Sequence, residues 1–216
     1  MIISLCDYTG IFTKPWRDAG HDALHIDPLR ENNGTILDMM PEIMEAMNKK
    51  VLFVAGFPPC TDVAVSGSRH FESKRSKDPH YQSKAALVAE QCRIIGELSG
   101  APWFFENPVS VFSSIFGKPD YIFHPYEFGG YLPVYDEHPE WPEYIKPRDA
   151  YPKKTCLWSG GGFVLPDKKP VPVNPGFSDQ HKKLGGKSQR TKNIRSATPR
   201  GFAQAVFETY GVELAL

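Results

Sequence analysis

Two short motifs, each at the end of an apolar run, carry the residues best suited to chemistry. The first places Cys60 after Pro58 and Pro59, at the end of the apolar residues 51–55. Because proline fixes φ and lacks an amide donor, the backbone before Cys60 is expected to be stiff. A thiolate attacks polarised carbon atoms, so a rigidly held cysteine suits nucleophilic catalysis. An isolated cysteine is also commonly a small core residue, and this alternative stays open for Cys60.

The second motif is Glu106-Asn107-Pro108, which follows the apolar residues 103–105. Pro108 disfavours regular continuation, so we expect Glu106 at the tip of a strand. Ligands bind at the carboxyl ends of strands in doubly wound sheets, and we therefore expect Cys60 and Glu106 to line one crevice. Partial burial would raise the pKa of a carboxyl group there and suit it to proton transfer. A structural, hydrogen-bonded acid is the alternative.

The start of the chain has the layout of a nucleotide-binding βαβ unit. Strands are expected at residues 2–5 and 23–26, with a helix at residues 14–19 between them. The first strand leads into a turn that ends at Gly10, and the second is followed by Asp27, whose carboxylate can accept both hydroxyls of a ribose. A single glycine is a weak signature, so an ordinary turn and a solvated Asp27 remain an alternative.

The spacing of apolar residues predicts the elements that hold these motifs in place. Helices are expected at residues 41–47 and 84–98, and a last helix has Thr198 at its cap and Pro199 at its first position. Residues 67–84 are polar and lack apolar periodicity, so we expect a mobile surface loop there. Alternation of predicted strands and helices indicates an α/β protein.

Length and composition favour one globular domain over residues 1–216. Acidic and basic residues balance at 25 each, which gives no overall preference for nucleic acid. The first apolar run is cut short at Asp7, so we expect no signal peptide, and no run is long enough to span a membrane. A reducing cytoplasm, without a zinc site or disulfide scaffold, suits the dispersed cysteines Cys6, Cys60, Cys92 and Cys156.

Both motifs resemble the catalytic motifs of the cytosine-C5 DNA methyltransferase family. The Pro-Pro-Cys turn is followed by Ser66 and Gly67, and Glu106-Asn107-Pro108 is similar to the Glu-Asn-Val motif with proline in place of valine. The resemblance implies a Rossmann-like α/β fold that depends on S-adenosylmethionine, with a mostly parallel sheet and helices on both faces. It implies that Cys60 adds to carbon 6 of cytosine while Glu106 protonates ring nitrogen 3. No metal is required.

The same resemblance assigns the other site residues. Those expected at the cofactor are Tyr8, Thr9, Gly10, Asp27, Asp38, Pro58 and Ser196. Those expected at the substrate, either the flipped base or its phosphates, are Pro59, Ser66, Arg69, Asn107, Lys153, Lys154 and Thr155. Asp38 matches less securely than Asp27, and an exposed or helix-capping acid is the alternative there.

The chain departs from the family pattern in three places. The glycines that normally follow Gly10 are missing, and residues 153–155 lack the Gln-x-Arg-x-Arg pattern of the corresponding strand. Residues 163–192 are too few for the usual target-recognition domain. We expect a short basic loop in its place that binds phosphates without reading sequence, which leaves room for a separate recognition partner. This layout resembles short members on bacteriophage genomes, which implies the cytoplasm of a bacterial or phage-infected cell.

The function favoured by these residues is transfer of a methyl group from S-adenosylmethionine to carbon 5 of cytosine in DNA, with the base flipped out of the duplex. Two alternatives stay open. The first is the same chemistry on a nucleotide, RNA or single-stranded DNA, or with another transferred group, and the short segment at residues 163–192 motivates it. The second is a non-catalytic nucleic-acid-binding relative, which the thinned glycine loop motivates.

Overall fold

The computed structural model describes residues 1–28, 35–173, 178–185 and 188–211. Contacts divide the chain into two compact units, each built from three segments, a division that the expected single domain did not include. The first unit comprises Met1–Tyr8, His21–Ile122 and Lys154–Val164, and the second comprises Thr9–Gly20, Phe123–Lys153 and Leu165–Leu216. In the described part of the chain, no helix is both long enough and apolar enough to cross a membrane.

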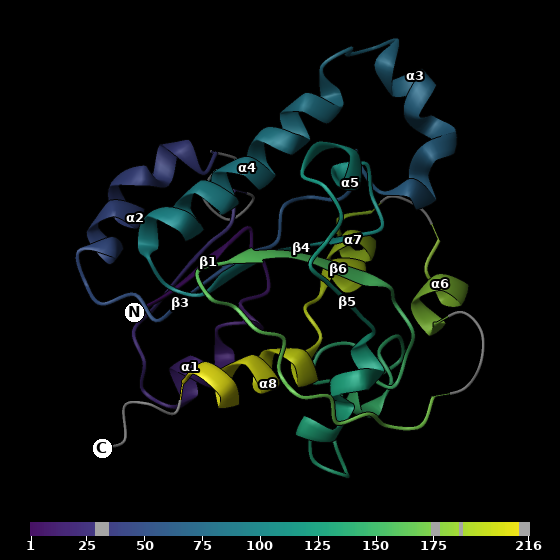
Figure 1. Cartoon of the computed structure of the whole chain (residues 1–216). Coiled ribbons are helices and arrows are strands. Elements are labelled where there is room, and N and C mark those ends of the chain that lie inside the picture. The colour runs from purple at the N-terminus through teal and green to yellow at the C-terminus, as the bar shows by residue number, and fades with distance from the viewer. Residues whose placement is uncertain (29–34, 174–177, 186–187, 212–216) are drawn as a thin grey trace. The chain divides into compact units, whose positions relative to one another are not determined.

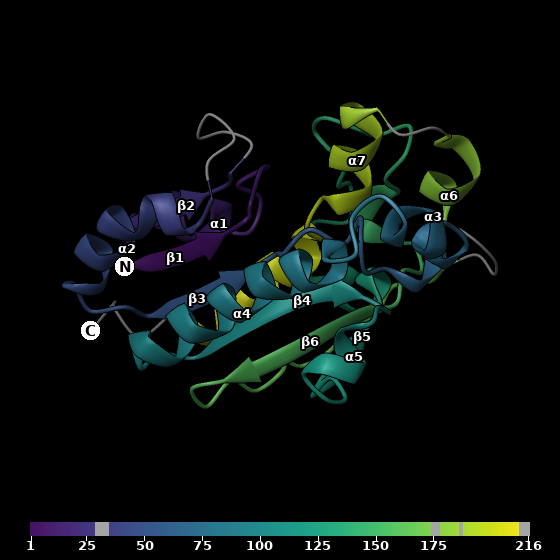
Figure 2. The ribbon, with the colours of Figure 1, turned by 90° about the horizontal axis from the view of Figure 1, so that it is seen from above.

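The first unit is built on a sheet of six strands in the order β2-β1-β3-β4-β6-β5, which can be followed in Figure 2 and is seen from another side in Figure 1. The strands are β1 Ile2–Leu5, β2 Ala23–Ile26, β3 Phe53–Gly56, β4 Trp103–Pro108, β5 Tyr121–Phe123 and β6 Thr155–Gly160. Strands β1 to β4 pair in parallel, whereas β6 runs antiparallel to β4. The predicted α/β class and mostly parallel sheet are therefore confirmed, in an arrangement compatible with a Rossmann-like fold.

Helix α4, Tyr81–Ser99, packs along β3 and β4 and holds this part of the sheet in place (Figure 2). The packing is close because glycine stands at two contact points. A Cβ atom on Gly96 would lie 2.5 Å from Cγ of Trp103, and one on Gly56 would lie 2.6 Å from Cβ of Cys92. The helix ends at Gly100, which has a φ of 67° as the left-handed C-cap position requires.

Alternate residues of the strands face two different apolar clusters, as the pleat of a sheet requires. On the α4 side, strand residues pack with side chains of α4 and of α2, Met40–Met47: Ile3, Leu5, Val54, Trp103, Phe105, Cys156 and Trp158 from the strands, and Ile43, Ala46, Ala89, Cys92 and Ile95 from the helices. On the opposite face of the sheet, the rings of Phe53 and Phe104 pack with the ring of Phe163, which follows β6. The centroids of the three rings are 5.4–5.9 Å apart.

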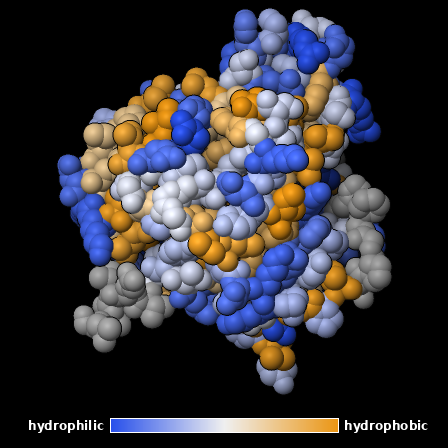
Figure 3. Space-filling view, viewed as in Figure 1, coloured by the Kyte–Doolittle hydropathy of each residue, from blue (hydrophilic) through white to orange (hydrophobic). Residues whose placement is uncertain are grey.

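The predicted loop at residues 67–84 is wrong, because most of it is helical. It holds most of η2, Val65–His70, then α3, Phe71–Arg75, and the start of α4. The ammonium group of Lys74 donates to the carbonyl oxygen of Thr61 at 2.8 Å and pairs with the carboxylate of Asp62 at 2.7 Å. These tertiary bonds, together with the contact between the rings of Phe71 and Tyr81, fix α3. Hydrophilic side chains cover the segment around it (Figure 3).

The second unit is helical around a small aromatic core. Its elements are α1 Lys14–Asp18, η3 Pro125–Tyr131, η4 Pro147–Asp149, α6 Asp179–Lys183, α7 Gln189–Ser196 and α8 Arg200–Tyr210. The rings of Trp16 and Phe207 meet edge-on at 5.3 Å, which joins α1 to α8. Phe202 of α8 stacks on Phe123 at 4.4 Å. These contacts give α8 its buried face.

Two expectations about the second unit are wrong. Helix α8 begins at Arg200, because Pro199 is extended, with ψ at 124°, and stands at the cap position predicted for Thr198. The amide of Gly201 donates instead to the carboxylate of Asp149 at 2.8 Å, so a distant residue satisfies the start of this helix. The basic loop expected at residues 163–192 is also not a loop throughout, since it contains α6 and the beginning of α7.

Candidate active site

The Cys60 turn follows β3 directly and is closed by its own backbone. The carbonyl oxygen of Cys60 accepts the amides of Val63 at 3.2 Å and Ala64 at 2.9 Å. Pro58 is buried, Pro59 is exposed, and Cys60 between this proline pair and the turn is half-buried. The thiol is therefore held on a short, constrained segment at the carboxyl end of a buried strand.

The Glu106 motif ends the neighbouring strand at the same edge of the sheet. Strands β3 and β4 pair with Gly56 opposite Phe105, so Glu106 follows this pair directly and Pro58 follows it after one residue. The side-chain nitrogen Nδ2 of Asn107 donates to the carbonyl oxygen of Pro58 at 2.9 Å, and this bond is buried. Asn107, predicted to contact substrate, thus ties the strand that carries Glu106 to the turn that carries Cys60.

The segments that follow the two motifs also pair with each other. Ala64 and Ser110 form an antiparallel bridge. On either side of it, the amide of Val65 donates to the carbonyl of Val109 at 2.9 Å, and the amide at position 111 donates to the carbonyl at position 63 at 3.1 Å. The Cys60 turn and the segment after Glu106 are therefore one hydrogen-bonded structure.

The environment of the cysteines separates Cys60 from the other three. All four are free thiols, but Cys6, Cys92 and Cys156 are buried. A hydrogen bond with Cys92 and burial raise the pKa of Cys6 well above its ordinary value. Burial also raises the pKa of Cys156, and the nearby charge of Glu106 adds to the increase. The core interpretation fits these three cysteines, while Cys60 alone is partly accessible.

The antiparallel strand β6 delivers two of the predicted substrate residues to the edge that carries Glu106. Because β6 is reversed, its first residue, Thr155, lies opposite Pro108. Thr155 is buried, and Lys154 before it is exposed. Lys153 belongs to the second unit, where its ammonium group donates to the carbonyl oxygen of Arg195 at 3.0 Å.

The carboxyl ends of three adjacent strands bear three of the predicted cofactor residues of the first unit. In the sheet, β2 lies on one side of β1 and β3 lies on the other. The topological switch point is therefore between β1 and β3. Tyr8 follows β1 and is half-buried, Asp27 follows β2 and is buried, and Pro58 follows β3 and is buried. Nucleotide cofactors bind outside the carboxyl ends of strands at such a point, so these residues fit a nucleoside ligand.

Asp7 belongs to this group, although sequence reasoning treated it only as part of a turn. Its carboxylate is buried and accepts the hydroxyl of Ser4 at 2.9 Å, while its amide donates to the carbonyl of Ile26 at 3.2 Å. Cys6 before it adopts a positive φ of 58°, which is uncommon for a residue with a side chain. The available signal was an acid close behind an apolar strand, which also identified Asp27.

Three further predicted residues of the first unit are exposed. Asp38 accepts both the amide and the hydroxyl of Thr35, at 2.6 and 2.8 Å, and these bonds lower its pKa. This is the local, capping-type arrangement of the alternative interpretation. Ser66 and Arg69 lie on η2, and the guanidinium Nε of Arg69 donates to the adjacent ring of His70 at 3.1 Å.

The remaining predicted cofactor residues belong to the second unit. Gly10 is buried with a φ of 65°, and its carbonyl oxygen accepts the hydroxyl of Thr13 at 3.1 Å. The hydroxyl of Thr9 accepts the amide of Ile11 at 3.3 Å. Ser196 is exposed at the end of α7, where its hydroxyl donates to a carbonyl within the same helix. Each of these residues thus has a local structural role.

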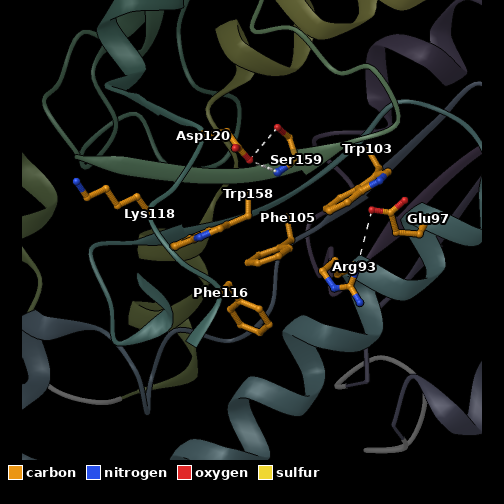
Figure 4. A pocket seen from close by; sticks show the side chains of 9 residues that line it. All are labelled: Arg93, Glu97, Trp103, Phe105, Phe116, Lys118, Asp120, Trp158 and Ser159. Carbon is orange, nitrogen blue, oxygen red and sulfur yellow. Dashed lines mark hydrogen bonds and ion pairs between the residues drawn. The ribbon is translucent and has the colours of Figure 1, made fainter. Parts of the chain in front are cut away.

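A cavity of about 380 Å³ lies on the α4 side of the sheet, apart from these motifs (Figure 4). Its lining residues are Arg93, Glu97, Trp103, Phe105, Phe116, Lys118, Asp120, Trp158 and Ser159. Asp120 accepts the amide and the hydroxyl of Ser159, and the lining includes neither Cys60 nor Glu106. This cavity is therefore not the candidate active site.

A second cavity, of about 610 Å³, lies between the start of α4 and residues 111–115. It is lined by Gln82, Ser83, Ala86, Val111, Ser114 and Ile115. Gln82 donates to the carbonyl of Asp62 at 3.4 Å, which links α4 to the segment just after Cys60. The cavity thus lies beside the structure that holds the thiol.

Comparison with known proteins adds no family assignment, because neither protein-family models nor curated proteins match this chain. The chemistry of the site therefore has to be argued from its residues. These comprise a partly accessible thiol after a proline pair, a half-buried carboxyl group on the next strand, and buried acids at the switch point.

Proposed function

We propose that this protein transfers a methyl group from S-adenosylmethionine to carbon 5 of cytosine in DNA. The observation that carries the proposal is the hydrogen bond from Asn107 to Pro58, which joins the Pro-Pro-Cys turn to the Glu-Asn-Pro end of the next parallel strand. These motifs, in this order, resemble those of the cytosine-C5 DNA methyltransferases. A Rossmann-like fold with helices on both faces of the sheet is part of this proposal.

In the proposed reaction, Cys60 is the nucleophile and Glu106 is the general acid, and both act on the same cytosine ring. The Cys60 thiolate forms a bond to carbon 6, and the electrons of the 5,6 double bond become available at carbon 5 as Glu106 donates its proton to ring nitrogen 3. This step needs a protonated carboxyl group at Glu106, which is half-buried at the end of β4. After methylation, carbon 5 loses its proton to solvent, the double bond reforms, the thiolate leaves, and Glu106 recovers its proton.

S-Adenosylmethionine supplies an electrophilic methyl group on its sulfonium, and carbon 5 takes that group as the carbon–sulfur bond breaks. Within the first unit, Tyr8, Asp27 and Pro58 would hold the nucleoside part of this cofactor. The carboxylate of Asp27 would accept the ribose hydroxyls, while Tyr8 and Pro58 would offer apolar surface to the adenine. Asp7, buried beside the same strand ends, adds a second carboxyl group there.

The proposal is tested by supplying labelled S-adenosylmethionine with duplex DNA, single-stranded DNA, RNA and cytidine nucleotides. We expect label on carbon 5 of cytosine in duplex DNA. Cys60→Ser should abolish turnover without changing cofactor affinity, and Glu106→Gln should lower the rate roughly 10²- to 10⁴-fold, the usual contribution of a general acid. The exposed Glu97→Gln variant is the matched control and should retain normal activity.

A duplex that contains 5-fluorocytosine tests the covalent step separately. Because fluorine cannot leave carbon 5 as the proton does, the Cys60 adduct should persist and migrate as a protein–DNA complex on a denaturing gel. Cys60→Ser should form no such complex. Label found only in nucleotides, RNA or single strands would support the same chemistry on another substrate. Cofactor binding without any transfer would instead indicate a non-catalytic relative.

A further inference from the structure

Helix α7 in the second unit is anchored on one side and polar on the other. The hydroxyl of Ser188 caps its start and accepts the amide of Thr191 at 3.2 Å. Thr191 and Ile194 are buried, and Ile194 packs in a cluster with Leu184 and Tyr151. These contacts fix the orientation of a helix that is only eight residues long.

The opposite face carries polar side chains of the types that can hydrogen-bond to nucleic acids. At 100° per residue, Gln189, Lys192, Asn193 and Ser196 form a stripe diametrically opposite the buried pair. Gln189, Lys192 and Ser196 are exposed, and Asn193 is half-exposed. The helix contains no acidic residue. Its outer face is therefore cationic and rich in amide groups.

Two arginines flank this stripe. Arg190 is exposed, and its guanidinium lies 5.5 Å from the ring centroid of Tyr144, a cation–π contact that holds the side chain beside the helix. On the other flank, Arg195 donates to the carbonyl oxygen of Leu184. Asp179 of α6 is already engaged by Lys146 at 3.0 Å and by a second lysine. Asp179 therefore does little to offset the charge that α7 presents.

The two amides of the stripe are held in a defined orientation. The side-chain nitrogen of Gln189 donates to the side-chain oxygen of Asn193 at 2.8 Å. This bond leaves the oxygen of Gln189 as an acceptor and the nitrogen of Asn193 as a donor. Adenine presents the complementary pair in the major groove, an N6 amino donor and an N7 acceptor.

We propose that α7 is a DNA-reading helix, which enters the major groove of duplex DNA in place of a separate target-recognition domain. The inference rests on the proposed function for the identity of its substrate. The major groove of B-form DNA, about 12 Å wide, admits one α-helix, whose diameter with its side chains is about 10–12 Å. Gln189 and Asn193 contact base edges, while Arg190 and Lys192 contact the flanking phosphates. The deep, narrow major groove of RNA excludes the same approach.

The test measures binding of the full-length protein to a labelled duplex selected from a randomised pool, by fluorescence anisotropy at several salt concentrations. Arg190→Gln and Lys192→Gln should each weaken binding to all duplexes and reduce the slope of log affinity against log salt by about 1. Asn193→Ala and Gln189→Ala should reduce the preference for the selected duplex over a scrambled one roughly 5- to 100-fold. Lys50→Gln and Gln204→Ala, on exposed or partly exposed sites elsewhere, are matched controls.

The outcomes separate this inference from the proposed function. If the α7 variants bind every duplex as the unmodified protein does while methyl transfer persists, the DNA-reading role is wrong and the enzyme assignment stands. If Asn193→Ala weakens binding to the selected and the scrambled duplex equally, α7 contacts only phosphates and base reading is wrong. Tighter binding of double-stranded RNA than of duplex DNA would also overturn the DNA-reading role. Duplex preference that depends on α7, without any methyl transfer, would support the helix and overturn the catalytic proposal.

Discussion

The Nδ2 group of Asn107 donates to the carbonyl oxygen of Pro58 at 2.9 Å and so couples the end of β4 to the turn before Cys60. Asn107→Ala removes this buried bond and leaves a carbonyl group without its donor. We expect a loss of roughly 1–3 kcal/mol in the free energy of unfolding, measured by urea denaturation. Methyl transfer should fall further than the fraction of folded protein does, because the Cys60 turn loses a positioning contact.

Asn48→Ala is the control for that change, because Asn48 is exposed at the C-cap of α2. We expect a much smaller effect on unfolding and none on catalysis. Equal losses of unfolding free energy and of methyl transfer in both variants would show that the Asn107 bond contributes no more than an exposed side chain does.

The burial of the cysteines predicts selective chemical labelling. Cys60 is half-buried, whereas Cys6, Cys92 and Cys156 are buried. In the folded protein, a thiol reagent such as iodoacetamide should therefore modify Cys60 first, and mass spectrometry should show one added group before any second. Cys60→Ser should abolish this fast phase. Fast labelling that survives in Cys60→Ser would place the accessible thiol elsewhere.

Asp149 predicts a pH dependence of stability in the second unit. Burial raises its pKa to about 6 from 3.8. The folded protein therefore holds this proton more tightly than the unfolded chain does, and the resulting stabilisation, present below pH 4, is lost as the pH rises through 6. Asp149→Asn retains an acceptor for Gly201 and tolerates the positive φ of 49°. The variant should thus become more stable than the unmodified protein by up to roughly 3 kcal/mol at pH 7.

Urea denaturation at pH 4, 5, 6 and 7 measures this difference. The gap between Asp149→Asn and the unmodified protein should widen with pH and level off above about 6. Asp38→Asn, at an exposed acid whose pKa is lowered by Thr35, should show no such widening. A constant gap for Asp149→Asn would mean that this carboxyl does not titrate in the range.

The ion pair between Arg200 and Asp136 is the most buried of the described salt bridges, with the two side chains 17% and 8% exposed. Burial opposes ionisation of Asp136, but hydrogen bonds from Arg200 and from the amide of Arg148 outweigh it and lower its pKa. Asp136→Asn would leave the Arg200 charge buried without its partner. We expect a loss of roughly 3–5 kcal/mol in the free energy of unfolding.

The exposed pair of Lys14 and Asp18 provides the matched comparison, because its side chains are 64% and 61% exposed. Asp18→Asn should change stability by less than about 1 kcal/mol. Similar losses for both variants, measured by thermal denaturation under one set of conditions, would contradict the importance of burial.

Close packing at Gly96 predicts a large effect of a small substitution. A Cβ there would lie 2.5 Å from the indole of Trp103, so Gly96→Ala forces α4 away from β4. Overpacking of this kind costs roughly 1–3 kcal/mol and outweighs the gain of about 1 kcal/mol in helix propensity. Gly67→Ala, where nothing lies within 4 Å of the added atom, should be nearly neutral in the same unfolding assay. A stabilised Gly96→Ala protein would refute this packing argument.

Local signals predicted the parallel half of the sheet well. The strands at residues 2–5 and 23–26 have the predicted bounds, because each is a short apolar run limited by turn-forming or acidic residues. The helix expected at residues 84–98 is confirmed and begins slightly earlier, at Tyr81. Helix α3 was missed because an ion pair between Lys74 and Asp62 fixes it, and such a partner cannot be read from local spacing.

The candidate site, like the fold, has some features that local sequence predicts and others that depend on residues far away in the chain. The ends of β3 and β4 could be predicted as neighbours, because both motifs follow apolar runs. The bond from Asn107 to Pro58 depends on the register of two strands, and the burial of Asp7 depends on β2 alongside it. Neither this hydrogen bond nor the burial of Asp7 follows from composition. The proximity of the Cys60 sulfur to the Glu106 carboxyl stays a prediction, for which the labelling and trapping experiments provide the test.

The position of β6 between β4 and β5 bears on how the protein is made. As the nascent chain leaves the ribosome, β5 emerges before β6, the neighbour through which it joins the sheet. The first unit can therefore complete its sheet only after residue 160 has emerged, and until then β4 presents an open edge. Chaperone binding during synthesis should peak in that interval, since unpaired strand edges invite aggregation.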